Sequence, residues 1–284
     1  MGLTVSLGEG NTPLLPAPRL SERLGCEIWL KCEGANPTGS MKDRGMALAV
    51  SRALERGAAG VVLASTGNTA ASAAAYAARA GLPAIVLLPE GAVARGKIAQ
   101  AIVAGAEIRP AGTFEDAHRE ARRLAEEEGL VNVNSINPDR VEGQSSAAVE
   151  VVQQLGGSVP DVLALPYGGG GNTRAYAMGF ERAGAGTPRI LAVQAARRAD
   201  TAASAIRIVE PVHRAQAEAL AEVVTVTDEE LLEWWGATAR LEGVFCELAS
   251  VAGVAGVAQL RPSGRVVCVL TGHGLKDPDA VDRL

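Results

Sequence analysis

Several kinds of residue are scarce in this chain of 284 residues, and each scarcity argues against a class of function. Positive charge is not in excess, because 27 lysines and arginines stand against 32 acidic residues and the net charge is −5. A chain with this balance offers no basic surface, so we expect no nucleic-acid partner. The four cysteines show neither CxxC nor histidine spacing, which predicts reduced thiols, a cytoplasmic location and no metal site.

Long hydrophobic runs are also missing. No apolar stretch has the length needed to cross a bilayer, and the first residues lack the basic and apolar regions of a secretory signal. We therefore expect no association with a membrane. Lysine is scarce as well, since it occurs only at positions 31, 42, 97 and 276 while arginine supplies all other basic residues.

Glycine and aliphatic residues, by contrast, are plentiful, and their order predicts an α/β fold with two mostly parallel, helix-covered sheets. Short apolar runs alternate with longer helical patterns. The predicted strands are residues 61–64, 84–88, 107–109, 131–133, 161–165, 189–193 and 265–270. The predicted helices are residues 41–56, 69–80, 95–104, 113–128, 140–155, 172–183, 227–241 and 250–260.

Helix ends are marked more clearly than domain ends. Glycines follow five of the predicted helices, as expected for left-handed caps, at positions 57, 81, 105, 129 and 156. The strand-loop-helix pattern is densest within residues 46–137, and no linker is evident. We predict two domains, a larger one from residues 1–45 and 138–284 and a smaller one nested at residues 46–137, with the ligand site in the cleft.

Lys42 lies in the segment 36–45 (NPTGSMKDRG), at a turn that leads into a predicted helix. Arginine stays protonated near neutral pH, whereas a partly buried lysine can lose its proton, form a Schiff base with an aldehyde and move protons. This chemistry points to pyridoxal phosphate. Taken alone, Lys42 is better explained as a solvated surface charge, and the other segments of the chain are what favour the cofactor.

A glycine-rich loop follows the predicted strand 161–165. It consists of Gly168, Gly169, Gly170, Gly171 and Asn172, and it opens the next predicted helix. Backbone amides that converge at a helix N-terminus bind phosphate without a charged side chain. The loop matches neither the dinucleotide pattern nor a Walker loop, so we interpret it as a phosphate site; a merely flexible loop is the alternative.

Two further loops follow predicted strands, at the edge where ligands of α/β sheets gather. Ser65, Thr66, Asn68 and Thr69 belong to one of them (STGNT), which suits a substrate carboxylate, while Asn68 is placed to bond a phenolic oxygen. Simple capping of the helix is the alternative. The other loop begins with Thr271, a neutral hydroxyl for a pyridine nitrogen. The histidines at 118 and 213 are expected to be solvated, and the one at 273 to be structural.

Together these segments resemble the pyridoxal-phosphate enzymes of the tryptophan synthase β fold type, and most closely the threonine synthase family. The resemblance spans nearly the whole chain. It rests on residues 8–14 (GEGNTPL), 36–45, 65–69, 134–140 (NSINPDR), 142–144 (EGQ), 246–250 (CELAS) and 271–278 (TGHGLKDP). It implies a fold type II enzyme that forms a homodimer and binds its cofactor in the larger domain.

The resemblance also implies roles for individual residues. Lys42 would bind the cofactor aldehyde and move protons, Asn68 would contact the ring oxygen, residues 168–172 would hold the cofactor phosphate, and Thr271 would meet the ring nitrogen. Ser65, Thr66 and Thr69 would bind the amino-acid substrate. Ser135 and Arg140 would bind the substrate phosphate, since the fixed fork of arginine suits phosphate oxygens.

The implied reaction is that of a carbon-oxygen lyase acting on phosphate in threonine biosynthesis. O-phospho-L-homoserine and water become L-threonine and phosphate. A threonine or serine dehydratase of the same fold is the alternative enzyme, and its loop resembles the tetraglycine segment better; it has no use, however, for Ser135 and Arg140. A cofactor-binding protein that has lost turnover is the alternative outside enzymes.

Overall fold

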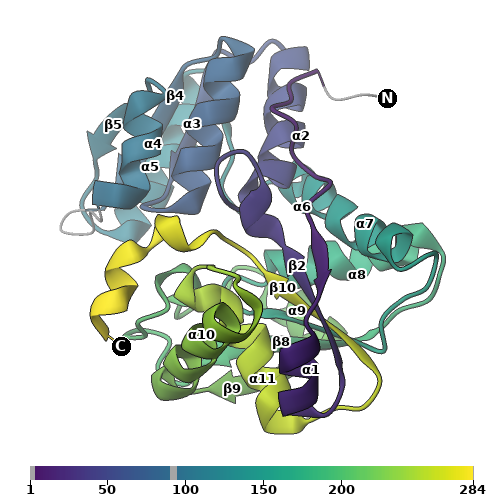
Figure 1. The fold of residues 1–284 in the computed structure, drawn as a ribbon. Coiled ribbons are helices and arrows are strands. Elements are labelled where there is room, and N and C mark those ends of the chain that lie inside the picture. Colours follow the sequence, from purple (N-terminus) through teal and green to yellow (C-terminus); the bar gives the residue numbers. More distant parts are fainter. Residues whose placement is uncertain (1–3, 90–94, 284) are drawn as a thin grey trace. The chain divides into compact units, whose positions relative to one another are not determined.

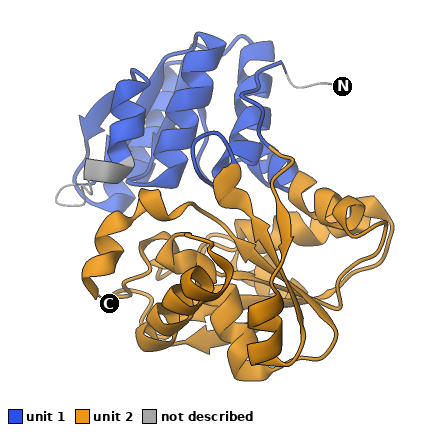
Figure 2. Ribbon diagram, in the orientation of Figure 1, with its two compact units in different colours: residues 1–9, 36–144 blue, residues 10–35, 145–284 orange. Residues whose placement is uncertain are grey.

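The computed structural model describes residues 4–89 and 95–283, which form two compact units. One unit consists of Met1–Glu9 and Asn36–Gln144, and the other of Gly10–Ala35 and Ser145–Leu284 (Figures 1 and 2). We call them unit 1 and unit 2. The predicted nested domain at residues 46–137 lies inside the longer segment of unit 1, and its exact boundaries stay a prediction.

Unit 1 is built on a parallel sheet with the strand order β5-β4-β3-β6. The strands are β3 (Gly60–Ala64), β4 (Ala84–Leu88), β5 (Glu107–Pro110) and β6 (Leu130–Asn132). The helices are α2 (Lys42–Glu55), α3 (Asn68–Ala80), α4 (Arg95–Val103), α5 (Phe114–Glu127) and α6 (Pro138–Gln144). Each βα connection returns the chain to the same edge of the sheet, so the loops after β3 and β6 are neighbours.

Both faces of the unit 1 sheet are covered, because successive side chains of a strand point to opposite faces. Val61 and Leu63 of β3 pack with α2 and the alanine-rich α3. Val62 and Ala64 pack on the other face against α5. Small alanine side chains let α3 lie close to the sheet, which fixes where its N-terminus meets the strand ends.

Unit 2 contains a mixed sheet with the strand order β1-β2-β10-β7-β8-β9, in which only the pair β1 and β2 is antiparallel. The strands are β1 (Leu14–Pro16), β2 (Glu27–Cys32), β7 (Val162–Pro166), β8 (Arg189–Ala195), β9 (Glu222–Val226) and β10 (Arg265–Leu270). The helices are α1 (Pro18–Leu24), α7 (Ser146–Gln154), α8 (Gly171–Ala183), α9 (Arg214–Leu220), α10 (Asp228–Glu242) and α11 (Ala252–Leu260). Short 3-10 helices occupy Glu33–Ala35, Ser204–Ile206, Leu248–Val251, Gly274–Lys276 and Pro278–Arg283.

The unit 2 sheet is also buried on two faces. Cys268 and Leu270 of β10 lie in a core shared with α10 and α11, whereas Val267 and Val269 face α7 and α8. β2 carries a fully buried Lys31, whose Nζ donates to Glu150 Oε2 at 2.9 Å, Gln154 Oε1 at 2.9 Å and Thr12 O at 2.8 Å. Lys31 is thus committed to a structural network.

Most predicted elements are present, and the differences have local causes. All five glycines expected as caps have positive φ, between 68° and 83°. The single helix predicted at residues 140–155 is wrong, because α6 and α7 are separate helices with Ser145 between them. The strand β2 was missed because Glu27 and Lys31 interrupt its apolar pattern. Across the described residues, no helix is both long enough and apolar enough for a membrane span.

Candidate functional site

Lys42 is the first residue of α2, and a tight turn delivers it there. Gly39 adopts φ +87°, which favours glycine, and its amide donates to Asn36 O at 2.8 Å. Asp43 then accepts bonds from the backbone N–H of Thr38 at 2.7 Å and from its hydroxyl at 2.6 Å. These contacts fix the turn and leave the Lys42 side chain half buried.

The loop after β3 carries Ser65, Thr66, Asn68 and Thr69. The first helical residue of α3 is Asn68 and its N-cap is Gly67, which has no side chain to satisfy the first amides of the helix. Simple helix capping by Ser, Thr or Asn is therefore wrong here. A helix N-terminus that lacks a side-chain cap is a place where an anionic group of a ligand can bind.

The loop after β6 is tied to the loop after β3. Asn134 spans the two, since its Oδ1 accepts from Ala64 N at 3.0 Å and its Nδ2 donates to Ala64 O at 2.8 Å. Ser135 follows directly and is half buried. The predicted substrate-binding loops of unit 1 thus lie side by side at the carboxyl edge of its sheet.

Arg140 is the most unusual charge in unit 1. It lies in α6, is only 3% exposed, and donates from Nη1 to Val133 O at 3.1 Å. Its Nε has no hydrogen-bond partner within the described residues, and none of their carboxylates pairs with it. Burial lowers the pKa of Arg140 to about 10. A buried guanidinium without a counter-anion is costly, and an anion bound beside it would offset that cost.

The acidic neighbour of Arg140 is engaged elsewhere. Arg52 of α2 donates to Asp139 Oδ1 at 2.5 Å and to Glu142 Oε2 at 2.7 Å, and Arg56 lies 3.6 Å from Asp139. The helices α2 and α6 pack closely. Gly45 of α2 makes this possible, since a Cβ added there would lie only 2.6 Å from Arg140 O. Lys42, at the start of α2, and Arg140, in α6, therefore lie on two helices that pack against each other.

In unit 2, the four-glycine loop leads from β7 into α8. Gly170 is the N-cap with φ +84°, and a Cβ there would lie 3.0 Å from Ala217 Cβ. A Cβ at Gly168 would lie 3.2 Å from Ala205 O. Glycine is therefore required at position 170 by the positive φ, and it is favoured at position 168 because a backbone oxygen lies close by. The first amides of a helix have no partner within the helix, and phosphate groups commonly bind at such N-termini.

Two donors at the start of α8 lack partners. Asn172 Nδ2 and Thr173 Oγ1 are buried, with 8% and 1% of their residues exposed, and neither atom bonds to any described residue. Buried polar groups are normally satisfied, and leaving one unpaired costs about 1–3 kcal/mol. A phosphate group would satisfy both, so this loop fits the phosphate of the expected cofactor.

Thr271 directly follows β10, which pairs with β7 in parallel. The two strand ends bring Thr271 and the glycine loop to the same edge of the unit 2 sheet. Ser250, which is fully buried, lies 3.2 Å from the Thr271 hydroxyl and accepts from Gly272 N at 3.0 Å. Glu247 N also donates to Gly272 O at 2.9 Å, so the Thr271 loop is held in one conformation.

Several residues near the glycine loop were missed from the sequence. Ser250 stands in the matched segment 246–250, which is the signal that identifies it. Arg198 gives no such signal; its guanidinium stacks 4.6 Å from the centre of the Tyr167 ring and donates to Ile208 O at 2.7 Å. The expectation that His213 is solvated is wrong, because it is 7% exposed and packs against the glycine loop.

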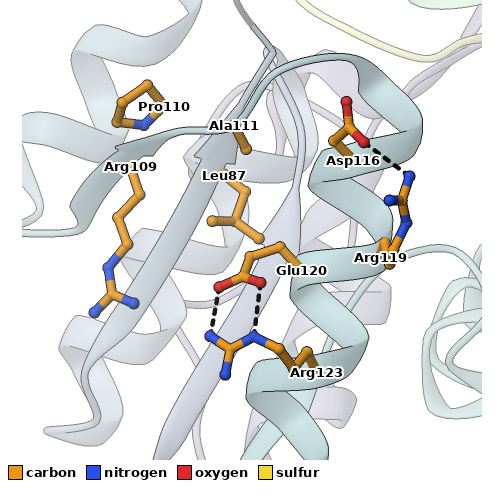
Figure 3. Close-up of a pocket in the computed structure, with 8 residues that line it drawn as sticks. All are labelled: Leu87, Arg109, Pro110, Ala111, Asp116, Arg119, Glu120 and Arg123. Atoms are coloured by element: carbon orange, nitrogen blue, oxygen red, sulfur yellow. Dashed lines mark hydrogen bonds and ion pairs between the residues drawn. The ribbon is translucent and has the colours of Figure 1, made fainter.

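A separate pocket of about 410 Å³ opens between β5 and α5 in unit 1 (Figure 3). It contains none of the predicted site residues. Its arginines are already paired, since Arg119 contacts Asp116 at 2.8 Å and Arg123 contacts Glu120 at 2.6 Å. The charges that line this pocket are thus compensated, whereas the charge of Arg140 is not compensated by any described residue. No cluster of metal-binding side chains occurs in the described parts of either unit.

Comparisons with known proteins agree with this chemistry. The profile of the family described as pyridoxal-phosphate dependent enzyme matches residues 5–272. The threonine synthase of Halalkalibacterium halodurans is 46% identical over 97% of this chain and 85% of its own length, and that of Synechocystis sp. is 48% identical over 97% and 79%. Among solved structures, a threonine deaminase from T.th. aligns with a TM-score of 0.81 and 28% identity, over 93% of this chain and 92% of that one. The chain therefore belongs to the pyridoxal-phosphate dependent enzymes and, within them, to the threonine synthase family.

Proposed function

We propose that this enzyme converts O-phospho-L-homoserine and water to L-threonine and phosphate. The observation that carries the proposal is Arg140, a buried cation without an anionic partner among the described residues. An enzyme whose substrate bears a second phosphate needs such a group in addition to the cofactor site. The identity to threonine synthases over 97% of the chain supports the same substrate.

Pyridoxal phosphate, the cofactor of the family, supplies an aldehyde for the substrate amine and a ring that withdraws electrons from the reacting carbons. We assign its phosphate to the amides and side-chain donors of residues 168–172. Thr271 is assigned to the ring nitrogen and Asn68 to the ring oxygen. With a neutral hydroxyl as its partner, the ring nitrogen would not need to be protonated, and the ring would then accept less charge than one paired with a carboxylate.

Lys42 is the proposed acid and base. Its Nζ removes the proton from Cα and then one from Cβ of the substrate, since both carbons must lose a proton before phosphate can leave Cγ. After phosphate leaves, a proton returned to Cγ completes the methyl group, water adds its hydroxyl at Cβ, and a last proton returned to Cα gives threonine. The position of Lys42 at the start of α2, in a turn fixed by Asp43, suits a side chain that must reach several atoms in sequence.

Ser135 and Arg140 are assigned to the substrate phosphate. The guanidinium favours the departing dianion more than the bound monoester, because the negative charge grows as the bond to Cγ breaks. Ser65, Thr66 and Thr69 are assigned to the substrate carboxylate, at the uncapped start of α3. With these contacts, both charged ends of the substrate are bound while Lys42 transfers protons at the carbons between them.

A threonine or serine dehydratase is the second candidate, favoured by the 28% identity and TM-score of 0.81 to a threonine deaminase. Phosphate release from O-phosphohomoserine should be measured beside ketoacid formation from threonine and serine, on the same purified protein. We expect phosphate and threonine in equal amounts and little ketoacid. Ketoacid as the main product would establish the dehydratase, and cofactor absorbance without any product would indicate a protein that has lost turnover.

We also propose a homodimer located in the cytoplasm. The family resemblance supports the dimer. The four cysteines support a reducing compartment, since all of them are free thiols and three are buried. Light scattering on the purified holoenzyme tests the dimer directly, and a monomer across the accessible concentration range would contradict it.

A further inference from the structure

His213 lies against the glycine loop of unit 2, on the segment that leads into α9. It is 7% exposed, and its backbone N–H donates to Gly169 O at 3.0 Å. Its carbonyl accepts from Ala217 N at 2.9 Å, which anchors it to the first turn of α9. The histidine is thus bound both to the loop and to a helix behind it.

The side chain of His213 occupies the space that the glycines leave empty. A Cβ at Gly170 would lie 3.2 Å from His213 Cβ, and one at Gly171 would lie 3.4 Å from Cδ2 and 3.7 Å from Nε2 of the ring. The ring edge therefore faces the first residue of α8. Packing from outside replaces the side chains that the loop lacks and restricts a backbone that four glycines would otherwise leave mobile.

Arg174 fixes the orientation of the ring. It lies in the first turns of α8, and its Nη1 is 2.8 Å from His213 Nδ1. Arginine has only donors, so Nδ1 must be the acceptor and a neutral ring carries its proton on Nε2. The bond joins the ring to the same helix whose N-terminus forms the loop.

We propose that His213 is a positioning residue for cofactor binding: it holds residues 168–172 in the shape that receives the phosphate of pyridoxal phosphate. The inference rests on the proposed assignment of that phosphate to the glycine loop. It predicts that His213 contributes to affinity for the phosphate group and leaves affinity for the rest of the cofactor unchanged. A purely structural role would affect both equally.

The test compares pyridoxal phosphate with pyridoxal, which keeps the aldehyde but lacks the phosphate. Dissociation constants of both are measured by absorbance titration of the full-length apoenzyme and its variants. For His213→Ala we expect the constant for pyridoxal phosphate to rise about ten-fold, as for a lost hydrogen bond and its packing, with pyridoxal unchanged. His213→Asn, whose amide oxygen can accept from Arg174 in place of Nδ1, should recover part of the loss.

His118→Ala is the matched control, because His118 is a half-buried histidine of α5 in unit 1. It should leave both constants unchanged. Asn172→Leu tests the phosphate assignment itself. If Asn172→Leu weakens pyridoxal phosphate selectively and His213→Ala does not, the inference about His213 fails while the loop assignment stands; if neither variant is selective, the loop assignment fails as well. Equal weakening of both ligands by His213→Ala would also overturn the inference.

Discussion

At the scale of single residues, the charges of unit 1 differ in whether they are compensated. Arg52, Arg119 and Arg123 each lie within 2.8 Å of a carboxylate oxygen. Arg140 has none among the described residues, although it is the most deeply buried of the four. Because an unpaired buried charge destabilises a protein, its presence is best explained by a ligand that completes it.

Lys42→Ala should abolish turnover and the visible absorbance of the bound cofactor, because the variant lacks the amine that reacts with the aldehyde. The measurement is borohydride reduction followed by mass spectrometry of the cofactor adduct. Lys276→Arg is the control, since it removes a primary amine and keeps the charge, and it should retain the adduct on Lys42. A cofactor adduct that survives in Lys42→Ala would contradict the assignment.

Arg140→Met should lower kcat/KM for O-phosphohomoserine by about ten- to a hundred-fold, the effect of losing a charge-assisted hydrogen bond of roughly 1.5–3 kcal/mol. Any side activity on threonine or serine should change little, because these substrates carry no phosphate. Steady-state kinetics on the three substrates decide the matter. Equal losses on all three would assign Arg140 to the fold rather than to the substrate.

The same substitution should stabilise the protein in the absence of ligands. Burial lowers the pKa of Arg140 from 12.5 to about 10, so protonation is disfavoured in the folded state. The resulting cost, about 3 kcal/mol, is present at every pH below the folded pKa and fades as the pH rises toward the unfolded value. At pH 7 we expect Arg140→Met to raise the free energy of unfolding by roughly 1–3 kcal/mol.

Denaturant unfolding in phosphate-free buffer measures this stability, and added inorganic phosphate supplies the control. Phosphate should stabilise the parent protein more than Arg140→Met, because only the parent has the buried cation. If Arg140→Met is less stable than the parent protein in phosphate-free buffer, the charge of Arg140 is already compensated in the ligand-free protein, and the prediction is wrong.

At the scale of elements, the contact between α2 and α6 links the predicted aldehyde-binding lysine to the predicted phosphate-binding arginine. Arg52 of α2 bridges Asp139 and Glu142 of α6, and the hydrogen bonds of both carboxylates, Glu142 first, raise the pKa of Arg52. The same bridge keeps the Asp139 carboxylate engaged beside Arg140. Removing the Arg52 guanidinium would take the nearest cation away from the Asp139 carboxylate, and Asp139 is only 4% exposed.

Arg52→Met should therefore reduce the free energy of unfolding by roughly 2 kcal/mol, between the values typical of exposed and buried pairs. It should also raise KM for O-phosphohomoserine, because the bridge holds α2 against α6, the helix that carries Arg140. Arg109→Met is the control, since the pair of Arg109 with Glu107 is exposed on β5 and should contribute nothing measurable. Unchanged stability and KM in Arg52→Met would contradict the proposed role of the bridge.

Helices and strands were predictable where their own residues decide them. The capping glycines at 57, 81, 105, 129 and 156 follow from local conformation, and all have the expected positive φ. The break between α6 and α7 and the strand β2 were not predictable, because partners distant in the sequence stabilise them. Lys31 lies in the core only because Glu150 and Gln154 of α7 receive it.

At the scale of the whole molecule, cofactor binding should stabilise the folded chain. A ligand that binds only the folded state adds about 2.7 kcal/mol at a hundred times its dissociation constant. Removing pyridoxal phosphate should lower Tm, and adding it back should restore Tm in a concentration-dependent way. Thermal unfolding of the apoenzyme with pyridoxal phosphate and with pyridoxal measures how much of this stabilisation depends on the phosphate; equal stabilisation by both would contradict the phosphate site.

The sequence by itself determined the α/β class, the order of most elements, and the loops at strand ends where Lys42, Asn68, the four glycines and Thr271 occur. These features depend on local periodicity, on glycine conformation and on short motifs, all of which are written along the chain. Only the tertiary structure decided which charges are compensated. Arg52 and Asp139 are 87 residues apart in sequence, so the isolation of Arg140 and the burial of His213 emerge only when distant segments pack together.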